Sequence, residues 1–167
     1  MGIPTALIVV SDRAAAGVRA DKTAALLKPV LVAAGFSLDA TRTVPDERAQ
    51  IGEAIRGAAR IASLVLTTGG TGVAPRDVTP EATRDVIDHE VPGLGEEMRR
   101  RSAAATPKAL GSRALGGILG QAVVVNLPGR PEGAVECFGH VAAVLPHLIA
   151  LRRGPVPDAS HEPPARA

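Results

Sequence analysis

The sequence predicts an α/β protein with three layers, in which a mostly parallel β-sheet lies between two layers of helices. Continuous apolar runs at positions 5–10, 63–68 and 122–127 are typical of strands that are buried on both faces. Segments with helical periodicity separate these runs. Strands joined by helices form βαβ units, which place parallel strands in one sheet and helices on both of its faces.

The first half of the chain alternates between strand and helix. Residues 22–34 are rich in Ala and Leu and end at Gly35, which is a common stop signal for a helix. Residues 36–44 alternate loosely between apolar and polar side chains and end at Pro45, as a strand does. The predicted elements are a strand at 5–10, a helix at 22–34, a strand at 36–44, a helix from Asp46 or Glu47 to Arg60 and a strand at 63–68.

The second half of the chain contains the start signals of three helices. Thr79-Pro80-Glu81 offers an N-cap, a proline at the first helical position and an early acid, while Pro92 and Pro131 open two further helices. The predicted elements are a helix from Thr79 to about His89, a helix from Pro92 through Arg101, a short antiparallel strand at 114–118, a strand at 122–127 and a helix from Pro131 to about Leu151 with an irregularity at Pro146.

Length and composition fit one globular domain. The chain has 167 residues, of which 46% are hydrophobic and 22% are charged, enough apolar material for a core without metals or disulfides. From Gly154 onward the sequence has four prolines and no periodicity, which predicts disorder. We therefore expect a domain at residues 1–153 and a disordered tail at 154–167.

Composition also excludes several classes of function. The chain has two Phe and neither Tyr nor Trp, so the aromatic platforms that bind single-stranded nucleic acids are missing. The net charge of +2 is spread along the chain, which argues against dedicated DNA or RNA binding. Cys137 is the single cysteine, no apolar run approaches the roughly 20 residues of a membrane span, and no signal-peptide pattern is present. We expect a cytoplasmic protein without membrane or nucleic-acid partners.

Polar or glycine-rich segments follow four of the predicted strands. In open α/β sheets, ligands bind outside the carboxyl ends of the strands. Because these ends lie at one edge of the sheet, the four segments are expected to converge on a single site. They are Ser11-Asp12-Arg13, Pro45-Asp46-Glu47, residues 68–79 and Pro128-Gly129.

The segment TTGGTGVAPRDVTP, from Thr67 to Pro80, carries the strongest signal. Its glycines allow backbone N–H groups to approach an anion, and its threonines add further donors. It matches neither the P-loop nor the dinucleotide-binding fingerprint, since no Gly-Lys-Ser/Thr follows and Pro75 stands where the third glycine belongs. The alternative is a flexible connection that needs positive φ angles. The length and glycine content favour a phosphate or nucleotide site.

Two aspartates, Asp46 and Asp77, lie on the same predicted edge. Carboxylates beside phosphate groups are natural ligands of Mg²⁺, which bridges phosphate oxygens. The alternative is that each aspartate caps a helix, although Thr79 is a better cap than Asp77. The spacing favours a nucleotide or phosphate site with a divalent metal.

Other reactive side chains give weaker signals. His89, His140 and His147 fall within predicted helices and have no partner at metal-ligand spacing, and we expect Cys137 to be a small core residue. Ser11 lacks the surrounding glycines of a hydrolase nucleophile. The arginines at 99–101 are expected to form a solvated helix face.

Several motifs taken together resemble a known family. The motifs are VSDR at 10–13, VPDE at 44–47, the segment at 67–80, VPG at 91–93, Ser112-Arg113 and NLPG at 126–129. In this order, over about residues 5–151, they resemble the molybdenum cofactor biosynthesis proteins of the MogA/MoaB type. The segment at 67–80 is the most specific of them.

The resemblance implies a reaction as well as a three-layer α/β/α fold. It implies a homotrimer or a hexamer that transfers AMP from Mg-ATP to the terminal phosphate of molybdopterin, with release of pyrophosphate. A molybdenum insertase would use the adenylated product. The catalytic aspartates of the family fall on Asp46 and Asp77, which are the implied Mg²⁺ ligands. The implied nucleotide and molybdopterin contacts are Ser11, Asp12, Thr68, Gly69, Gly70, Thr71, Gly72, Thr79, Ser112, Pro128 and Gly129.

A phosphate nucleophile is already largely ionised near neutral pH, so catalysis would rest on positioning and charge neutralisation rather than on a strong base. We therefore assign Asp46 and Asp77 to metal binding and substrate orientation. Two residues depart from the family pattern: Arg130 stands where Ser, Asn or Gln is common, and Gly111 where Leu is common. The alternatives are a molybdopterin carrier or scaffold without turnover, and a generic nucleotide-binding module of the flavodoxin type.

Overall fold

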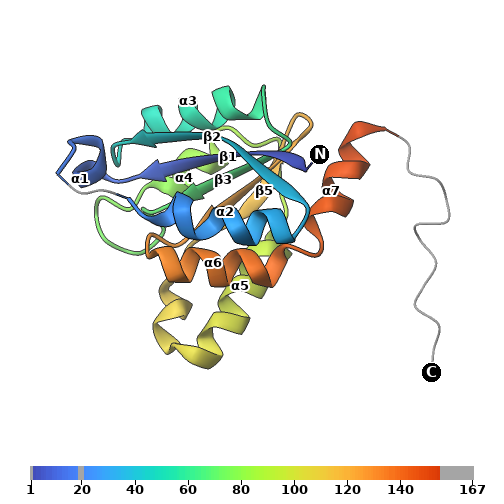
Figure 1. The fold of residues 1–167 in the computed structure, drawn as a ribbon. Coiled ribbons are helices and arrows are strands. Elements are labelled where there is room, and N and C mark those ends of the chain that lie inside the picture. The colour runs from blue at the N-terminus through green and yellow to red at the C-terminus, as the bar shows by residue number, and fades with distance from the viewer. Residues whose placement is uncertain (1, 19–20, 155–167) are drawn as a thin grey trace.

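The computed structural model describes residues 2–18 and 21–154, and its strands form a six-stranded sheet (Figure 1). The strands are β1 (Ile3–Val10), β2 (Phe36–Val44), β3 (Leu64–Thr68), β4 (His89–Glu90), β5 (Gly116–Leu119) and β6 (Ala122–Leu127). Their order in the sheet is β2-β1-β3-β6-β5-β4. The first four strands of this order are parallel neighbours, whereas β5 runs antiparallel to both β6 and β4. The sheet is thus mostly parallel, as predicted.

Helices cover both faces of this sheet. The helices of the described residues are α1 (Asp12–Ala15), α2 (Thr23–Ala33), α3 (Arg48–Ala59), α4 (Thr79–Arg84), α5 (Pro92–Ala105), the 3-10 helix η1 (Pro107–Gly111), α6 (Pro131–Val141) and α7 (Leu145–Arg153). One face packs against α3 and α4, and the other against α2, α5, α6 and α7 (Figure 1). The three-layer α/β/α prediction is confirmed.

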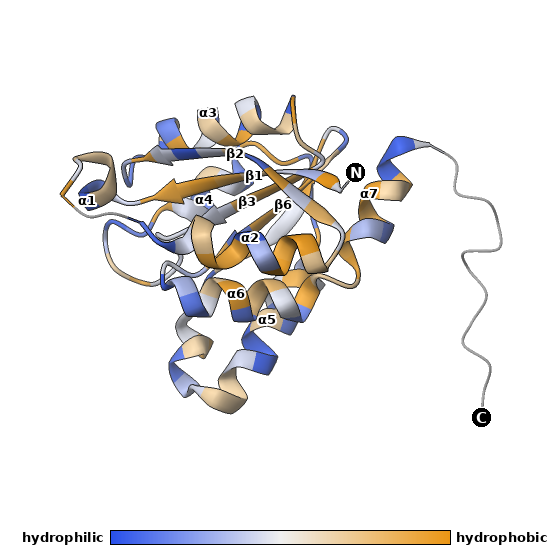
Figure 2. Ribbon diagram, viewed as in Figure 1, coloured by the Kyte–Doolittle hydropathy of each residue, from blue (hydrophilic) through white to orange (hydrophobic). Residues whose placement is uncertain are grey.

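Successive residues of the parallel strands feed two separate cores. On β1, Leu7 and Val9 pack on the side of α2 and α6, whereas Ile8 and Val10 pack on the side of α3 and α4. Figure 2 shows the continuous apolar character of β1 toward its carboxyl end, as this arrangement requires. When both faces of a strand are buried, successive side chains are all apolar and do not alternate with polar ones. This explains the apolar runs of the sequence.

The helix predicted to begin at Thr79 does begin there, but its C-terminal end and its N-cap differ from the prediction. The helix α4 ends at Arg84, because the following backbone joins the sheet: Asp88 N–H donates to the Ile118 carbonyl at 2.7 Å, just before β4. His89 therefore lies on a strand. At the other end the N-cap is Val78 rather than Thr79, whose hydroxyl is turned away and donates to the Gly69 carbonyl at 2.8 Å.

The predicted final helix consists of two helices, α6 and α7, which meet at 63°. Pro146 lies in the first turn of α7. Backbone N–H groups at this position have no acceptor within the helix, so a proline costs no hydrogen bond there. The predicted irregularity is thus confirmed. Within the part of the chain that the structure describes, no single helix is long and apolar enough to cross a membrane. Of the described helices, only the bent pair of α6 and α7, taken together, has the length and apolar composition of a membrane span. Its side chains Phe138, Leu145 and Ile149 are buried in the core.

The helix α7 is attached to the amino-terminal edge of the parallel strands. Arg152 Nε donates to the Gly120 carbonyl at 3.0 Å, and Arg153 Nη2 donates to Ser63 Oγ at 2.5 Å. Ser63 directly precedes β3, and Gly120 lies in the turn before β6. The tail predicted from residue 154 lies, apart from Gly154, outside the described residues.

Candidate active site at the carboxyl edge of the sheet

The carboxyl ends of four parallel strands lie side by side, as the sequence predicts. Val10 pairs with Val44, Val9 pairs with Thr68, and Thr68 pairs with Leu127. The segments that follow these residues therefore meet at one edge. The antiparallel strand β5 begins at this same edge, which brings Ser112 and Arg113 to it from the opposite chain direction.

The glycine loop, residues 69–72, depends on the absence of side chains. Gly69 and Gly70 have φ angles of 102° and 62°. A Cβ on Gly69 would overlap the carbonyl oxygen of Val10, and a Cβ on Gly70 would lie 2.5 Å from Thr79 Oγ1. The alternative of a connection that needs positive φ is thus correct for the backbone. The backbone N–H groups of Gly70, Thr71 and Gly72 donate no hydrogen bond to any described residue.

The turn at Pro128-Gly129 packs directly on the glycine loop. Thr68 Oγ1 donates to the Pro128 carbonyl at 2.8 Å, and a Cβ on Gly129 would lie only 3.2 Å from Gly69 Cα. Both contacts hold two glycine-containing segments against each other across the ends of β3 and β6.

The buried side-chain amide of Asn126 connects the elements on either side of the glycine loop. Asn126 Nδ2 donates to Thr67 Oγ1 and to Thr83 Oγ1, each at 2.9 Å, and thereby ties β6 to β3 and α4. Thr83 Oγ1 in turn donates to the Thr79 carbonyl at 2.8 Å. Sequence reasoning did not assign Asn126 this role. The available signal was one polar residue inside the apolar run at 122–127.

Asp12 and Asp46 hold each other through reciprocal hydrogen bonds. Asp12 N–H donates to Asp46 Oδ2 at 2.8 Å, and Asp46 N–H donates to Asp12 Oδ1 at 3.0 Å. Asp46 does not cap α3, whose N-cap is Glu47 and has no side-chain cap bond. On the outer side, Arg76 pairs with Asp12 at 2.9 Å and with Glu47 at 3.0 Å.

The two carboxyl groups differ in acidity. Burial raises the pKa of Asp46 above its ordinary 3.8, and the nearby charges of Asp12 and Asp77 act in the same direction. The N–H of Asp46 and the guanidinium of Arg76 instead lower the pKa of Asp12. A bound cation beside Asp46 would therefore relieve unfavourable charge on this carboxylate.

Asp77 is held inside its own loop and caps no helix. Its Oδ2 accepts the Ala74 N–H at 2.9 Å and would lie 2.8 Å from a Cβ on Gly72. Asp77 N–H donates to the Ala74 carbonyl at 2.9 Å. These bonds fix the carboxylate beside the glycine loop.

Asp46 and Asp77 can each offer one carboxylate oxygen to a metal ion. The described residues hold no cluster of three or more His, Cys, Asp or Glu side chains placed to bind a metal. Mg²⁺ commonly takes one or two carboxylates together with water and substrate phosphates. In both Asp46 and Asp77, one carboxylate oxygen accepts a backbone N–H, whereas Oδ1 accepts no hydrogen bond from the described residues.

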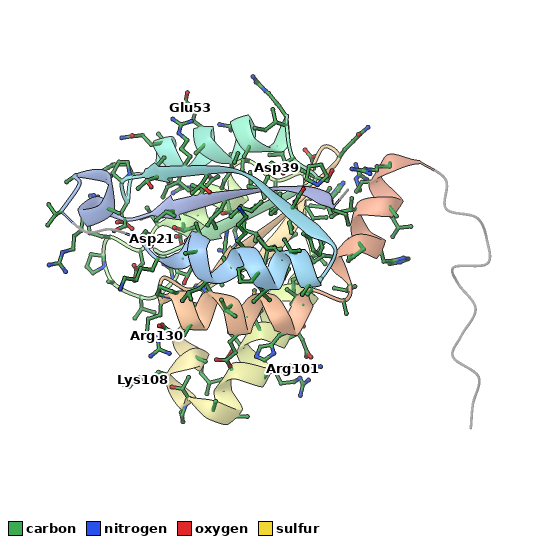
Figure 3. All side chains as sticks on the ribbon, in the orientation of Figure 1. Asp21, Asp39, Glu53, Arg101, Lys108 and Arg130 are labelled. Carbon is green, nitrogen blue, oxygen red and sulfur yellow. The ribbon has the colours of Figure 1, made fainter. Side chains whose placement is uncertain are left out.

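Two cavities open at this edge and share Gly129. The smaller cavity, of about 240 Å³, is lined by Val9, Val10, Ser11, Ala14, Asp21, Asp46, Thr68, Gly69, Gly70 and Gly129. The larger cavity, of about 580 Å³, is lined by Thr71, Gly72, Val73, Met98, Arg99, Ser102, Thr106, Lys108, Ala109, Gly111, Ser112, Ala114, Pro128, Gly129, Arg130, Gly133, Glu136 and Cys137. Figure 3 shows Lys108 and Arg130, two of the lining cations, on the same side of the molecule.

The structure brings most of the predicted site residues to these cavities. Of the others, Asp12 is exposed and holds Asp46, Asp77 lies in the loop beside Gly72, and Thr79 is fully buried under the glycine loop. Ser11 lines the smaller cavity and also caps α1, since Ser11 Oγ accepts the Ala14 N–H at 3.2 Å. The short helix α1 was not predicted.

The remaining candidates take other positions. Cys137 lines the larger cavity, where burial raises the pKa of its thiol, which does not favour a nucleophilic role. His140 lies 3.4 Å from Glu136 on the same helix. The arginine run is not uniformly solvated: Arg100 and Arg101 pair with Glu97, but Arg99 Nη1 donates to the Ala114 carbonyl at 2.7 Å.

Comparison with known proteins identifies the family. A family model described as "Probable molybdopterin binding domain" matches residues 6–147. The chain is a member of the MogA/MoaB family of molybdenum cofactor biosynthesis proteins. Its role therefore lies in the biosynthesis of that cofactor, as the motifs at 10–13, 44–47 and 67–80 indicate.

Two bacterial relatives of this MogA/MoaB protein share one enzyme name. The molybdopterin adenylyltransferase of Escherichia coli (strain K12) is 42% identical, covering 93% of this chain and 88% of the relative. That of Haemophilus influenzae is 44% identical, covering 78% of this chain and 68% of the relative. Both names agree with the predicted nucleotidyltransferase class.

Solved structures of MogA/MoaB proteins have the same fold. The molybdopterin biosynthesis enzyme MoaB from Thermus thermophilus superposes with a TM-score of 0.85 at 42% identity, over 92% of this chain and 98% of that chain. The molybdopterin biosynthesis Mog protein from Mycobacterium ulcerans gives 0.83 at 35% identity, over 90% and 99%.

Proposed function

We propose that this protein is a molybdopterin adenylyltransferase, which transfers AMP from Mg-ATP to the terminal phosphate of molybdopterin and releases pyrophosphate. The observation that carries the proposal is the junction of two unlike cavities at Gly129, one containing Asp46 and the other Arg99, Lys108, Ser112 and Arg130. Such a junction suits a reaction between two bound phosphates. Molybdopterin adenylyltransferases that align with most of the chain support the same assignment.

The smaller cavity suits the nucleotide. Asp46 borders it, and Asp77 lies beside the glycine loop that separates the two cavities. A Mg²⁺ ion held by Asp46, Asp77 and the ATP phosphates would neutralise charge that develops on the phosphoryl oxygens. The open N–H groups of Gly70, Thr71 and Gly72 would orient the α-phosphate through direct hydrogen bonds.

The larger cavity suits molybdopterin. Its wall combines Met98, Ala109 and Ala114 with the polar groups of Ser112, Lys108 and Arg130, which matches a heterocycle carrying a phosphate. Arg130, the departure from the family pattern, is exposed at the N-terminus of α6, where a cation would strengthen phosphate binding.

The experiment is pyrophosphate release by the full-length protein with molybdopterin, ATP and Mg²⁺, compared with Asp77→Ala. We expect release that needs all three components and falls about 10²- to 10³-fold in the variant, the usual cost of losing a group that stabilises the transition-state charge. Asp39→Ala is the control, since Asp39 lies on β2 far from the carboxyl edge (Figure 3). Molybdopterin binding without release would instead favour the carrier or scaffold function.

The assembly, location and partner are proposed with the activity. A homotrimer or hexamer would cover large apolar side chains that are exposed in the single chain, such as Val32 and Ile61. Light scattering of the purified protein tests this state. Use of ATP fits the cytoplasm, and the adenylated product would pass to a molybdenum insertase.

A further inference from the structure

Arg113 makes more hydrogen bonds to the site than any of the residues predicted for it. Its Nε donates to the Gly72 carbonyl at 2.7 Å, and its Nη2 donates to the Asp77 carbonyl at 2.5 Å. Its backbone N–H donates to the Thr71 carbonyl at 2.8 Å. One residue thus holds both ends of the 72–77 loop, the loop that carries Asp77.

The remaining nitrogen of this guanidinium is held by Glu81. Arg113 Nη1 forms an ion pair with Glu81 Oε1, and both side chains are about one-third exposed, at 35% and 32%. The other oxygen, Glu81 Oε2, is buried and has no hydrogen-bond partner in the described residues. Arg113 is therefore the cation that compensates this half-buried carboxylate, and Glu81 fixes the plane of the guanidinium.

Arg113 joins the wall of the larger cavity to the loop that carries Asp77. The preceding residue, Ser112, lines the larger cavity, and Asp77, on the far side of the guanidinium, lies beside Gly72 of the glycine loop. A planar group with several fixed donors can hold Gly72 and Asp77 at once, which a lysine ammonium on a flexible stem cannot do with the same geometry. The loop itself contains few other internal bonds: the two between Ala74 and Asp77 are those the structure gives.

We infer that Arg113 is a positioning residue, which places the Asp77 carboxylate for metal binding and keeps that loop in register with the wall of the larger cavity at Ser112. The inference rests on the proposed function for its catalytic readout. Its structural readout, the order of the 72–77 loop, is independent of any activity.

The test compares Arg113→Lys with Glu81→Gln and with Arg48→Lys. Arg48→Lys is the matched control, because Arg48 also makes a two-pronged pair, with Asp85 at 2.6 Å for both bonds, but lines neither cavity. Amide hydrogen exchange over residues 72–78 is measured without ligands. Steady-state pyrophosphate release is measured as a function of Mg²⁺, ATP and molybdopterin.

We expect clearly faster exchange of the loop amides in Arg113→Lys and unchanged exchange in Arg48→Lys. Its kcat should fall about ten- to a hundred-fold, as expected when a reacting group is displaced by about 1 Å, and half-saturation should need several-fold more Mg²⁺. The KM for molybdopterin should change less. Glu81→Gln should have a smaller effect, because Gln still accepts the hydrogen bond and the bonds to the Gly72 and Asp77 carbonyls remain.

Two results would overturn the inference. One is unchanged exchange and Mg²⁺ dependence in Arg113→Lys, with only a lower melting temperature shared by Arg48→Lys. The other is an equal effect of Glu81→Gln and Arg113→Lys, which would reduce the role of Arg113 to the ion pair. If the wild-type protein releases no pyrophosphate, the proposed function fails, whereas the exchange data still decide whether Arg113 orders the loop.

Discussion

The two cavities that meet at Gly129 are built from different materials. The smaller cavity is formed by strand ends and backbone, and its charged side chains are the acids Asp21 and Asp46. The larger cavity is formed by α5, η1 and the start of α6, and it contains Arg99, Lys108 and Arg130 against the single acid Glu136. Under the proposed function, this difference would let the carboxyl ends of the strands hold two anionic groups close together. The acidic side would accept an anion through a metal ion, whereas the basic side would accept one directly.

The largest expected effect comes from removing the acidic character of the smaller cavity with Asp46→Asn. Pyrophosphate release should fall about 10²- to 10³-fold, as for other lost electrostatic groups. Asp39→Asn serves as the control. An active Asp46→Asn enzyme would contradict the assignment of the metal to this side.

The same variant should not lose stability. Because burial raises the pKa of Asp46 in the folded protein above its unfolded value of 3.8, folding disfavours the ionised carboxylate. The cost is present near neutral pH and disappears as the pH falls through the folded pKa. The melting temperature of metal-free Asp46→Asn should therefore equal or exceed that of the wild type at pH 7, with the gap closing in acid.

The next effect in size is on the backbone between the cavities. Gly70→Ala places a Cβ at a φ of 62° and close to Thr79 Oγ1, so unfolding free energy should fall by about 1–3 kcal/mol. The matched change Gly57→Ala lies in α3 with nothing within 4 Å of the new Cβ and should gain about 0.5–1 kcal/mol. Urea denaturation of both variants measures the difference. Equal stabilities would mean that the loop does not require glycine.

A smaller effect is expected from neutralising the basic side. Arg130→Gln should raise the KM for molybdopterin about three- to ten-fold at low salt, and the difference should shrink in about 1 M salt, where the screening length is about 3 Å. Arg60→Gln, an exposed change at the end of α3, keeps the net charge equal to that of the variant. If both variants behave alike, Arg130 acts only through the overall charge.

The smallest effect should appear in the pH profile. As the pH falls, Asp46 takes up a proton before an ordinary aspartate does, because its pKa is raised. Mg²⁺ and the proton compete for this carboxylate, so the acid limb of the activity should move to lower pH when Mg²⁺ is increased. The measurement is kcat/KM against pH at two Mg²⁺ concentrations. An acid limb at the same pH for both Mg²⁺ concentrations would show that Asp46 does not bind the metal.

The parts of the fold that sequence predicts well are those with one dominant physical signal. The strands β2 and β6 begin and end at the predicted residues, because burial on the sheet and the turn residues beside them agree. The helix α4 fails for the opposite reason. The sequence after Arg84 still favours a helix. However, Asp88 hydrogen-bonds to Ile118 of the sheet, and this contact between distant residues overrides the local preference.

The candidate site divides in the same way. Asp46, Asp77 and the glycine loop are visible because each follows a strand, and strand ends share an edge. Asn126 and Arg113 belong to the motifs of the family, but their supporting roles are not visible in the sequence. Their partners lie on other elements: Thr67 and Thr83 for the amide, and the 72–77 loop for the guanidinium. Sequence shows which groups border a ligand, but not which groups hold them in place.

The attachment of α7 bears on how the protein can be handled and joined to others. Arg152 and Arg153 fasten this helix beside Gly120 and Ser63, at the edge opposite both cavities (Figure 1). A purification tag, a surface linker or a second catalytic domain connected after Arg153 would extend from the amino ends of the parallel strands. The two cavities lie at the carboxyl ends, so immobilised or fused forms should leave both cavities accessible.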